Sequence, residues 1–214
     1  MNYFDINHFY NYGFAFVKGF DKEIAQLSSI MKQTTWVSNP VDDRAYKIPE
    51  WLRNKLLIDP ECEVNPPFEI EAILLQMMKS SYFFNMMGNK TISLYDTYIY
   101  NGTKGQGWHW EGYEVPYTCP WFMMIYFNND WEEHHSGQIE FGSINWNLDV
   151  NIYDYETACN YSFNNDIIPT HSIAPVAGTC LLATNQNPTI LHRVLPSNPK
   201  YDRLALLGVF QVEV

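Results

Sequence analysis

Two histidines and one carboxylate are the residues of this chain whose types and spacing suggest chemistry. His109 and Glu111 stand two positions apart, so in an extended strand their side chains point to the same face. His192 follows far downstream, within another short apolar run. Two imidazoles and one carboxylate form the facial triad that holds non-haem Fe(II) and leaves coordination positions open. The sequence therefore predicts a metal site made of His109, Glu111 and His192.

A fourth residue with chemical potential is Arg203, at the start of the last apolar run. Its guanidinium is a planar fork that can hold a carboxylate through two parallel hydrogen bonds. Near a metal, such a group suits a dicarboxylate that chelates iron with its other end. The plainer interpretations are a solvated charge at a strand end for Arg203 and an ordinary core histidine for His192.

The first part of the chain predicts helices. Apolar residues recur at helical spacing over 22–32 and 68–87, and Asp21 is the expected N-cap of the first of these helices. A shorter helix is expected to open at 49–52, where a proline suits the first turn. Residues 34–50 show no periodicity and predict a loop.

The second part of the chain predicts strands. From residue 92 onward the apolar runs are short, rich in Tyr, Ile and Val, and bounded by Gly, Asn and Pro. Residues 175–178 predict a tight turn, and the Asn-rich residues 143–171 predict an insertion or a pair of long loops. The expected strands lie at 14–17, 92–100, 107–111, 121–128, 138–142, 172–176, 179–184, 190–194 and 203–213.

Helices followed by about eight antiparallel strands predict an α+β fold that is mostly β, with a two-sheet jelly roll. The length of 214 residues is enough for one domain with a sizeable core. We expect a single domain over 1–214, in which residues 1–90 form a helical support region and residues 91–214 form the β core that carries the insertion.

The composition limits the range of partners. The formal net charge is −11, with 13 Lys and Arg against 24 Asp and Glu, which argues against nucleic acid as a partner. The four cysteines form no CxxC pair and are expected to be free buried thiols. No signal peptide and no membrane-spanning apolar run are evident, so we expect a cytoplasmic protein.

Several short motifs, in their order and spacing, resemble the 2-oxoglutarate- and Fe(II)-dependent oxygenases, in particular the prolyl-4-hydroxylase-like branch. They span about residues 98 to 210, nearly all of the expected β core. The matching pieces are 98–102 (YIYNG), 109–111 (HWE), 124–130 (MIYFNND), 136–141 (SGQIEF), 178–179 (GT), 191–196 (LHRVLP) and 202–204 (DRL).

The resemblance implies a double-stranded β-helix, a cupin-like jelly roll with the N-terminal helices packed on one sheet. It implies His109, Glu111 and His192 as the iron ligands. This chain has a glutamate where the family usually has an aspartate, so the carboxylate reaches one methylene further. Halogenase relatives have a small residue at this position, so Glu111 favours hydroxylation.

For the cosubstrate, the resemblance implies that Arg203 binds the distal carboxylate of 2-oxoglutarate and that Tyr98 or Tyr100 adds a hydroxyl group. The common tyrosine three residues before the first histidine is Gln106 here. The implied activity is that of a dioxygenase, an oxidoreductase that uses Fe(II), 2-oxoglutarate and O₂, with ascorbate as a possible supporting reductant. It would hydroxylate an amino-acid or peptidyl substrate and convert 2-oxoglutarate to succinate.

Four large aromatic residues near the motifs are candidate substrate contacts, although packing against the helices explains them equally well. They are Trp108, Trp110, Tyr113 and Tyr126. Residues 130–135 (DWEEHH) are interpreted as a solvated hairpin loop, with a metal-binding or substrate-covering loop as the alternative. His171 receives no role.

Two other classes of protein remain open. One is a non-catalytic jelly-roll module that binds a ligand, and the other is a cupin-type isomerase or dioxygenase that needs no cosubstrate. The presence of all four residues, His109, Glu111, His192 and Arg203, favours the enzyme over the binding module. Arg203 argues against the third class. The oligomeric state is not predicted.

Overall fold

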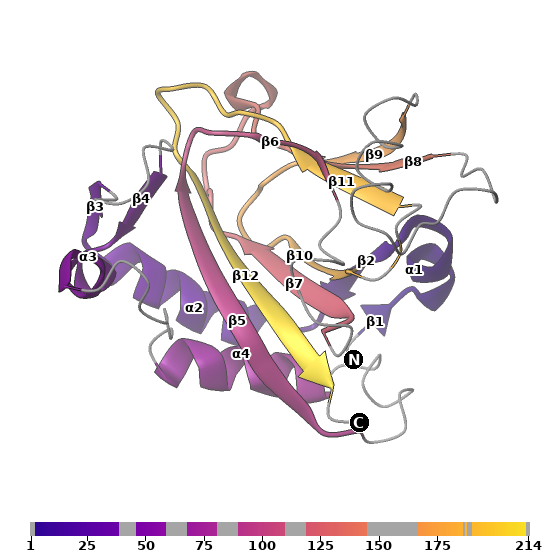
Figure 1. Cartoon of the computed structure of the whole chain (residues 1–214), viewed down its shortest axis with the longest axis horizontal. Helices are drawn as coiled ribbons and strands as arrows, with labels where there is room; N and C mark the ends of the chain where they lie inside the picture. The colour runs from indigo at the N-terminus through magenta and orange to yellow at the C-terminus, as the bar shows by residue number, and fades with distance from the viewer. Residues whose placement is uncertain are drawn as a thin grey trace.

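Two antiparallel sheets pack face to face in the computed structural model of this chain (Figure 1). It describes residues 3–38, 46–58, 68–80, 90–109, 119–144, 167–185, 187 and 190–212. This is the mostly β, double-stranded architecture expected from the sequence, and the helices lie where the jelly-roll prediction put them, against one sheet.

The larger sheet has eight strands and is built from both ends of the chain. Its order is β1 (Tyr3–Phe4), β2 (Phe14–Lys18), β10 (Cys180–Thr184), β7 (Trp121–Tyr126), β12 (Arg203–Val212), β5 (Ile92–Gly102), β4 (Tyr46–Pro49) and β3 (Trp36–Ser38). The smaller sheet has the order β6 (Gln106–His109), β11 (Ile190–Val194), β8 (Ile139–Ser143) and β9 (Ile168–Ile173).

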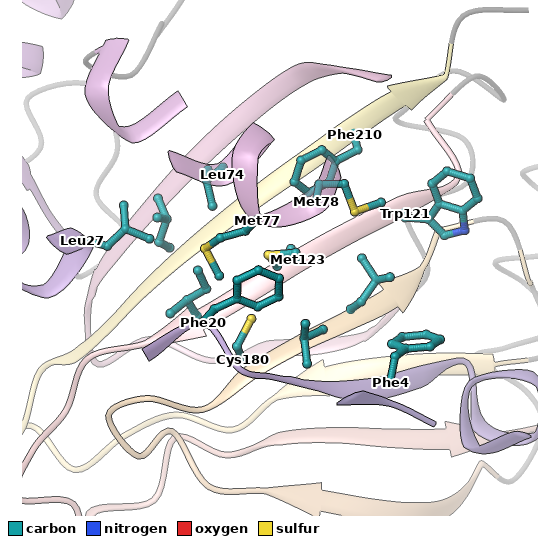
Figure 2. Close-up of a cluster of buried hydrophobic side chains, with 14 of the residues drawn as sticks. Phe4, Phe20, Leu27, Leu74, Met77, Met78, Trp121, Met123, Cys180 and Phe210 are labelled. Carbon is teal, nitrogen blue, oxygen red and sulfur yellow. The ribbon is translucent and has the colours of Figure 1, made fainter. Parts of the chain in front are cut away.

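The outer face of the large sheet is covered by α2 (Asp21–Gln33) and α4 (Phe68–Ser80) (Figure 1). Both helices present an apolar stripe, and Leu27, Leu74 and Met77 are fully buried against the strands (Figure 2). Each such side chain stabilises the fold by roughly 1.5–3 kcal/mol. This layer contains the main apolar core and packs the central strands against the helices.

The inner face of the same sheet packs against the small sheet. Side chains alternate along β7, so Trp121, Met123 and Ile125 face the helices while Phe122, Met124 and Tyr126 face the space between the sheets. The strands therefore supply one set of residues to the core and a second set to an interior between the two sheets.

A short helix, α1 (Ile6–Tyr12), lies beside β2 and reaches β8 and β9 (Figure 1). Asp5 caps its start by accepting a hydrogen bond from the backbone N–H of His8 (3.0 Å). Gly13 ends it in the left-handed conformation with φ 76°, and a Cβ there would lie 2.7 Å from Ile190. The helix is thereby fixed between the edges of the two sheets.

The N-terminal region differs from the helical support that the sequence predicts. Residues 36–38 and 46–49 form the edge strand β3 and its neighbour β4 instead of a loop, and α1 was not predicted. The α3 helix (Glu50–Ile58) begins directly after Pro49, as expected. Asp21 is the first helical residue and makes no cap, because Phe20 occupies the cap position.

In the second half of the chain, the predicted strands agree with the observed ones to within a few residues, except at β9. Residues 168–171 belong to this strand and not to the insertion, whose residues 145–166 lie outside the described part. Cys119 and Cys180 are free and buried, as expected, and burial raises the pKa of the Cys180 thiol to about 12. No helix within the described ranges has the length and apolarity to cross a membrane.

Candidate functional site

His109 and His192 lie side by side on the inner face of the small sheet. They are direct partners in the antiparallel register of β6 and β11, and their ring centroids are 4.2 Å apart. His192 is buried with 5% of its surface exposed, and His109 is half-buried. Two residues that are far apart in sequence thus place their imidazoles at one point, which is the arrangement that a shared metal ion requires.

The ring orientation of His109 is set by its own strand. Its Nδ1 atom lies 2.6 Å from the carbonyl oxygen of Gly107. Because a carbonyl can only accept, Nδ1 is the protonated nitrogen of the neutral ring, and the lone pair lies on Nε2. A hydrogen bond from the non-ligating nitrogen to a carbonyl is the usual support for a metal-ligating histidine.

On the outer face of the same sheet, Trp108 and Leu191 form a small apolar cluster that holds β6 against β11. The guanidinium of Arg193 lies over the Trp108 ring, 4.7 Å from its centroid, and pairs with Glu140 of β8 at 2.6 Å. The neighbours of the two histidines therefore fix the strand register. Trp108 faces away from the interior, so its position gives no support to the predicted substrate contact.

Arg203 is the first residue of β12. It lies at the end of the barrel where the chain turns between β5 and β6, at Lys104, and where it leaves β11, at Leu195. It donates hydrogen bonds to the carbonyl oxygens of Leu195 (3.3 Å) and Lys104 (3.4 Å). Gly105 brings this turn close, because a Cβ there would lie 2.6 Å from the carbonyl oxygen of Val194. Among the described residues, no carboxylate forms an ion pair with Arg203.

The hydroxyl group of Tyr126 lies in the same interior. Tyr126 is fully buried, and its hydroxyl has no hydrogen-bond partner among the described residues. Burial raises the pKa of Tyr126 well above its usual value, and the charge of Arg203 opposes this shift. Burial also lowers the pKa of Arg203, which the nearby Tyr126 and Tyr100 hydroxyls partly offset. Arg203 is half-buried, and a guanidinium beside a tyrosine hydroxyl is a combination of groups that can hold an anionic group.

Some of the predicted site residues lie outside the described part of the chain. These residues are Trp110, Glu111 and Tyr113. Tyr98 of β5 pairs with Leu207 of β12, but the side chain of Tyr98 is not among those that the structure describes. Within the described ranges no group of three His, Cys, Asp or Glu side chains converges, so the histidine pair stands without a described third ligand.

Residues 130–135 are not a hairpin, because β7 and β8 belong to different sheets. The segment ends in a 3₁₀ turn over Glu133–His135, and the His135 ring is buried and stacked 3.6 Å from the Tyr201 ring. A pocket of about 290 Å³ lies here, between this segment and residues 197–203. Its lining includes neither His109 nor His192.

Sequence reasoning gave no role to His171, and it did not single out His8. The structure brings their rings to 5.0 Å from each other, next to Phe14. Because β9 was predicted to begin four residues too late, the place of His171 in the sheet was not visible from the sequence.

No family model and no curated protein matches the chain. Solved structures do match over nearly its full length. An oxidoreductase of the 2OG-Fe(II) oxygenase family from Burkholderia pseudomallei is 12% identical over 96% of this chain and 87% of its own, with a TM-score of 0.51. The epimerase SnoN in complex with Fe³⁺, α-ketoglutarate and nogalamycin RO is 11% identical over 96% and 81%, with a TM-score of 0.52.

A prolyl hydroxylase from Trichoplax adhaerens, in complex with a hypoxia inducible factor peptide fragment, is 15% identical over 96% of this chain and 86% of its own, with a TM-score of 0.50. At these identities the comparison shows the fold: this chain has the double-stranded β-helix of the 2-oxoglutarate- and Fe(II)-dependent oxygenases. Proteins of this fold include hydroxylases and epimerases, so the fold does not determine the substrate.

Proposed function

We propose that this chain is an Fe(II)- and 2-oxoglutarate-dependent dioxygenase that hydroxylates an amino-acid or peptidyl substrate and converts 2-oxoglutarate to succinate. The observation that carries the proposal is the pairing of His109 with His192 inside a barrel that also contains Arg203. These groups are of the types that an iron chelate of a dicarboxylate needs.

His109 and His192 fit an iron site, and Glu111 would supply the carboxylate ligand. When bound, iron would supply the activation of dioxygen. The protein's part is to hold the imidazoles in place and to keep the site dry. The rings of Phe122 and Phe141 lie 5.3 Å and 6.0 Å from the His192 ring, and they shield it on the interior side.

Arg203 and Tyr126 would hold the distal carboxylate of 2-oxoglutarate. The carboxylate would accept hydrogen bonds from the guanidinium and from the hydroxyl that has no described partner. We therefore assign Tyr126 to the cosubstrate and not to the substrate, and we keep Tyr98 and Tyr100 as further candidates. Tyr100 packs on the inner core, and its electrostatic interaction with Arg203 raises the pKa of Arg203, against the larger lowering by burial.

The substrate class rests on the motifs that resemble the prolyl-4-hydroxylase-like branch, and Trp110 and Tyr113 remain candidates for contacts with it. The cytoplasmic location and the absence of a nucleic-acid partner stay predictions from composition.

Succinate formation tests the proposal. The protein is incubated with Fe(II), 2-oxoglutarate, O₂ and ascorbate, and peptides and amino acids are screened as substrates that stimulate turnover. We expect wild type to form succinate and Arg203→Met to need about 10–100-fold more 2-oxoglutarate, because a charged hydrogen bond to the cosubstrate is lost. Lys200→Met, an exposed cation three residues earlier in the chain, is the matched control and should behave as wild type.

A ligand-binding module without catalysis predicts a different result. It would form no succinate under any condition, and Arg203→Met would leave the affinity for 2-oxoglutarate unchanged.

A further inference from the structure

Strand β6 changes its register with β11 immediately before His109. Gln106 pairs with Val194, and His109 pairs with His192. Three steps along β6 therefore match two steps along β11, so β6 contains one extra residue between the two pairs. An extra residue in one strand of an antiparallel pair is a β-bulge, which bends the strand and re-aims a side chain. The bulge thus lies directly next to a proposed iron ligand.

The bulge decides which residue of β6 lies opposite His192. Gly107 and Trp108 both lie opposite the single residue Arg193, and the extra residue returns His109 to the interior face. In a regular ladder that continues from the preceding pair, Trp108 would lie opposite His192 and His109 would point outward, because a shift of one residue exchanges the two faces of a strand. The pairing of the two imidazoles therefore depends on the bulge.

Arg193 contacts the bulge from the outer face of the small sheet. Its guanidinium lies 4.7 Å from the centroid of the Trp108 ring. Its Nε and Nη2 atoms both lie 2.6 Å from one carboxylate oxygen of Glu140, the directly opposed residue of β8. The Trp108 ring also packs over Gly142 of β8, where a Cβ would lie 2.9 Å from it. One side chain, anchored on β8, thus holds a bulged residue of β6 across β11.

The bulge also orients the His109 ring. The carbonyl oxygen of Gly107 lies 2.6 Å from His109 Nδ1, and accepting that hydrogen bond leaves the lone pair on Nε2. Gly107 is exposed, and water competes for a hydrogen bond at an exposed position. The carbonyl therefore keeps its direction only while the backbone of the bulge is held, and the contact between Arg193 and Trp108 holds the other bulged residue.

We propose that Arg193 is a positioning residue of the proposed iron site: by stacking on Trp108 it holds the β6 bulge, and the bulge presents His109 to the interior with Nε2 as the ligating nitrogen. The side chain of Arg193 lies on the opposite face of the sheet from the two imidazoles, so it acts on His109 through the strand. The metal part of the proposal rests on the proposed function, whereas the link from Arg193 to His109 is measurable without metal.

The protonated nitrogen of His109 is the most direct readout. Ring ¹H–¹⁵N NMR spectra of the metal-free, full-length protein are recorded at about pH 8, where an imidazole of ordinary pKa is neutral. We expect wild type to carry the proton of His109 on Nδ1. Arg193→Met should move it toward Nε2, and Arg193→Lys, which keeps a cation over Trp108, should stay closer to wild type.

Metal affinity gives the second readout. Co(II), titrated in place of Fe(II) and followed by visible absorption, should bind Arg193→Met about tenfold more weakly than wild type, the effect of losing an outer support of a ligand. Gly142→Ala displaces the Trp108 ring without changing any charge and should have the same two effects. Combining both substitutions should add little, since each acts through Trp108.

A control separates geometry from stability. Leu74→Ala loses stability on the helix side of the large sheet and should leave both the His109 spectrum and the Co(II) affinity as in wild type. A half-exposed ion pair contributes little stability, so Arg193→Met should melt near the wild-type temperature.

The proposal is overturned if the His109 spectrum is unchanged in both Arg193→Met and Gly142→Ala, or if Leu74→Ala weakens Co(II) binding as much as Arg193→Met does. Its failure is distinct from that of the proposed function. Succinate formation with an unchanged His109 spectrum in the variants would refute only the positioning role. A changed spectrum in a protein that binds no metal would support the link from Arg193 to His109 and refute the oxygenase.

Discussion

The two faces of the eight-stranded sheet are made by the same strands and yet differ in character. Toward the helices, the buried side chains of β7, β10 and β12 are entirely apolar or sulfur-containing (Figure 2). Toward the small sheet, the same strands contribute Tyr126 and Arg203, and His192 lies over Phe122. Period-two alternation thus separates a face that supplies stability from a face whose polar groups are only partly satisfied.

The difference teaches where unpaired polar atoms are tolerated. Leu74 and Met77 on the helix side have no polar atoms to satisfy, and their removal can only lose contacts. On the inner face, the Tyr126 hydroxyl and the His171 Nδ1 are buried without described partners. Such groups lower stability, and the proposed function gives the Tyr126 hydroxyl a ligand to pair with.

The largest expected effect comes from His192 and its neighbour Leu191, which point to opposite faces of β11. His192→Ala should lower succinate formation by more than about 100-fold, since losing even an outer-shell partner of a metal ligand costs 10–100-fold. Leu191→Ala should lower stability by about 2–5 kcal/mol and leave the rate per folded molecule near wild type. The rate of succinate formation and the urea denaturation of both variants are compared. An equal loss of rate in the two variants would show that the two faces of β11 do not differ in function.

On the helix side, Leu74→Ala should lower the free energy of unfolding by about 2–5 kcal/mol, because Leu74 is fully buried between α4 and the sheet. The Michaelis constant for 2-oxoglutarate should not change. Denaturant unfolding measures the first quantity and initial rates of the folded protein measure the second. A changed Michaelis constant at unchanged stability would show that the helix layer also shapes the site.

Tyr126→Phe should change cosubstrate binding and not stability, which is the reverse of Leu74→Ala, and the change in free energy should be smaller. Removing an unpaired buried hydroxyl should leave stability unchanged or raise it slightly, while the Michaelis constant for 2-oxoglutarate should rise by up to about tenfold, the value of one hydrogen bond. A loss of stability with normal cosubstrate binding would mean that the hydroxyl has a structural partner outside the described residues.

The smallest expected effect is on how the free energy of unfolding depends on pH. The pKa of His171 in the folded protein lies below its ordinary value of 6.5. As the pH falls through that ordinary value, the unfolded chain takes up a proton that the folded chain does not, so stability decreases. His171→Asn should therefore lose less stability than wild type between about pH 8 and pH 5. Parallel slopes in urea denaturation would show that His171 titrates alike in both states.

Much of the β core could be predicted from the sequence, because its strands are short apolar runs bounded by Gly, Asn and Pro. Strands β3 and β4 could not, since they are three and four residues long and are held by pairing with each other and, for β4, with β5 far away in the chain. Helix α1 escaped prediction because seven residues with one buried side chain give no apolar stripe.

For the site, residue types and spacing were enough to nominate His109, His192 and Arg203, and the register places the two histidines together. The same logic missed His171, since its strand exposes most of its side chains and carries no apolar pattern. Only the pairing of β8 with β9 places it opposite Phe141, which in turn lies opposite His192. The position of Tyr126 beside Arg203 likewise depends on the pairing of β7 with β12.

The most direct test of the central claim is anaerobic titration of Fe(II) into the protein with 2-oxoglutarate present, monitored by visible absorption. The account predicts that wild type gives the weak charge-transfer band of an iron chelate of 2-oxoglutarate. His192→Ala should abolish it, and Arg203→Met should require more 2-oxoglutarate to reach it. The absence of the band in wild type, or a band that persists unchanged in His192→Ala, would contradict the account.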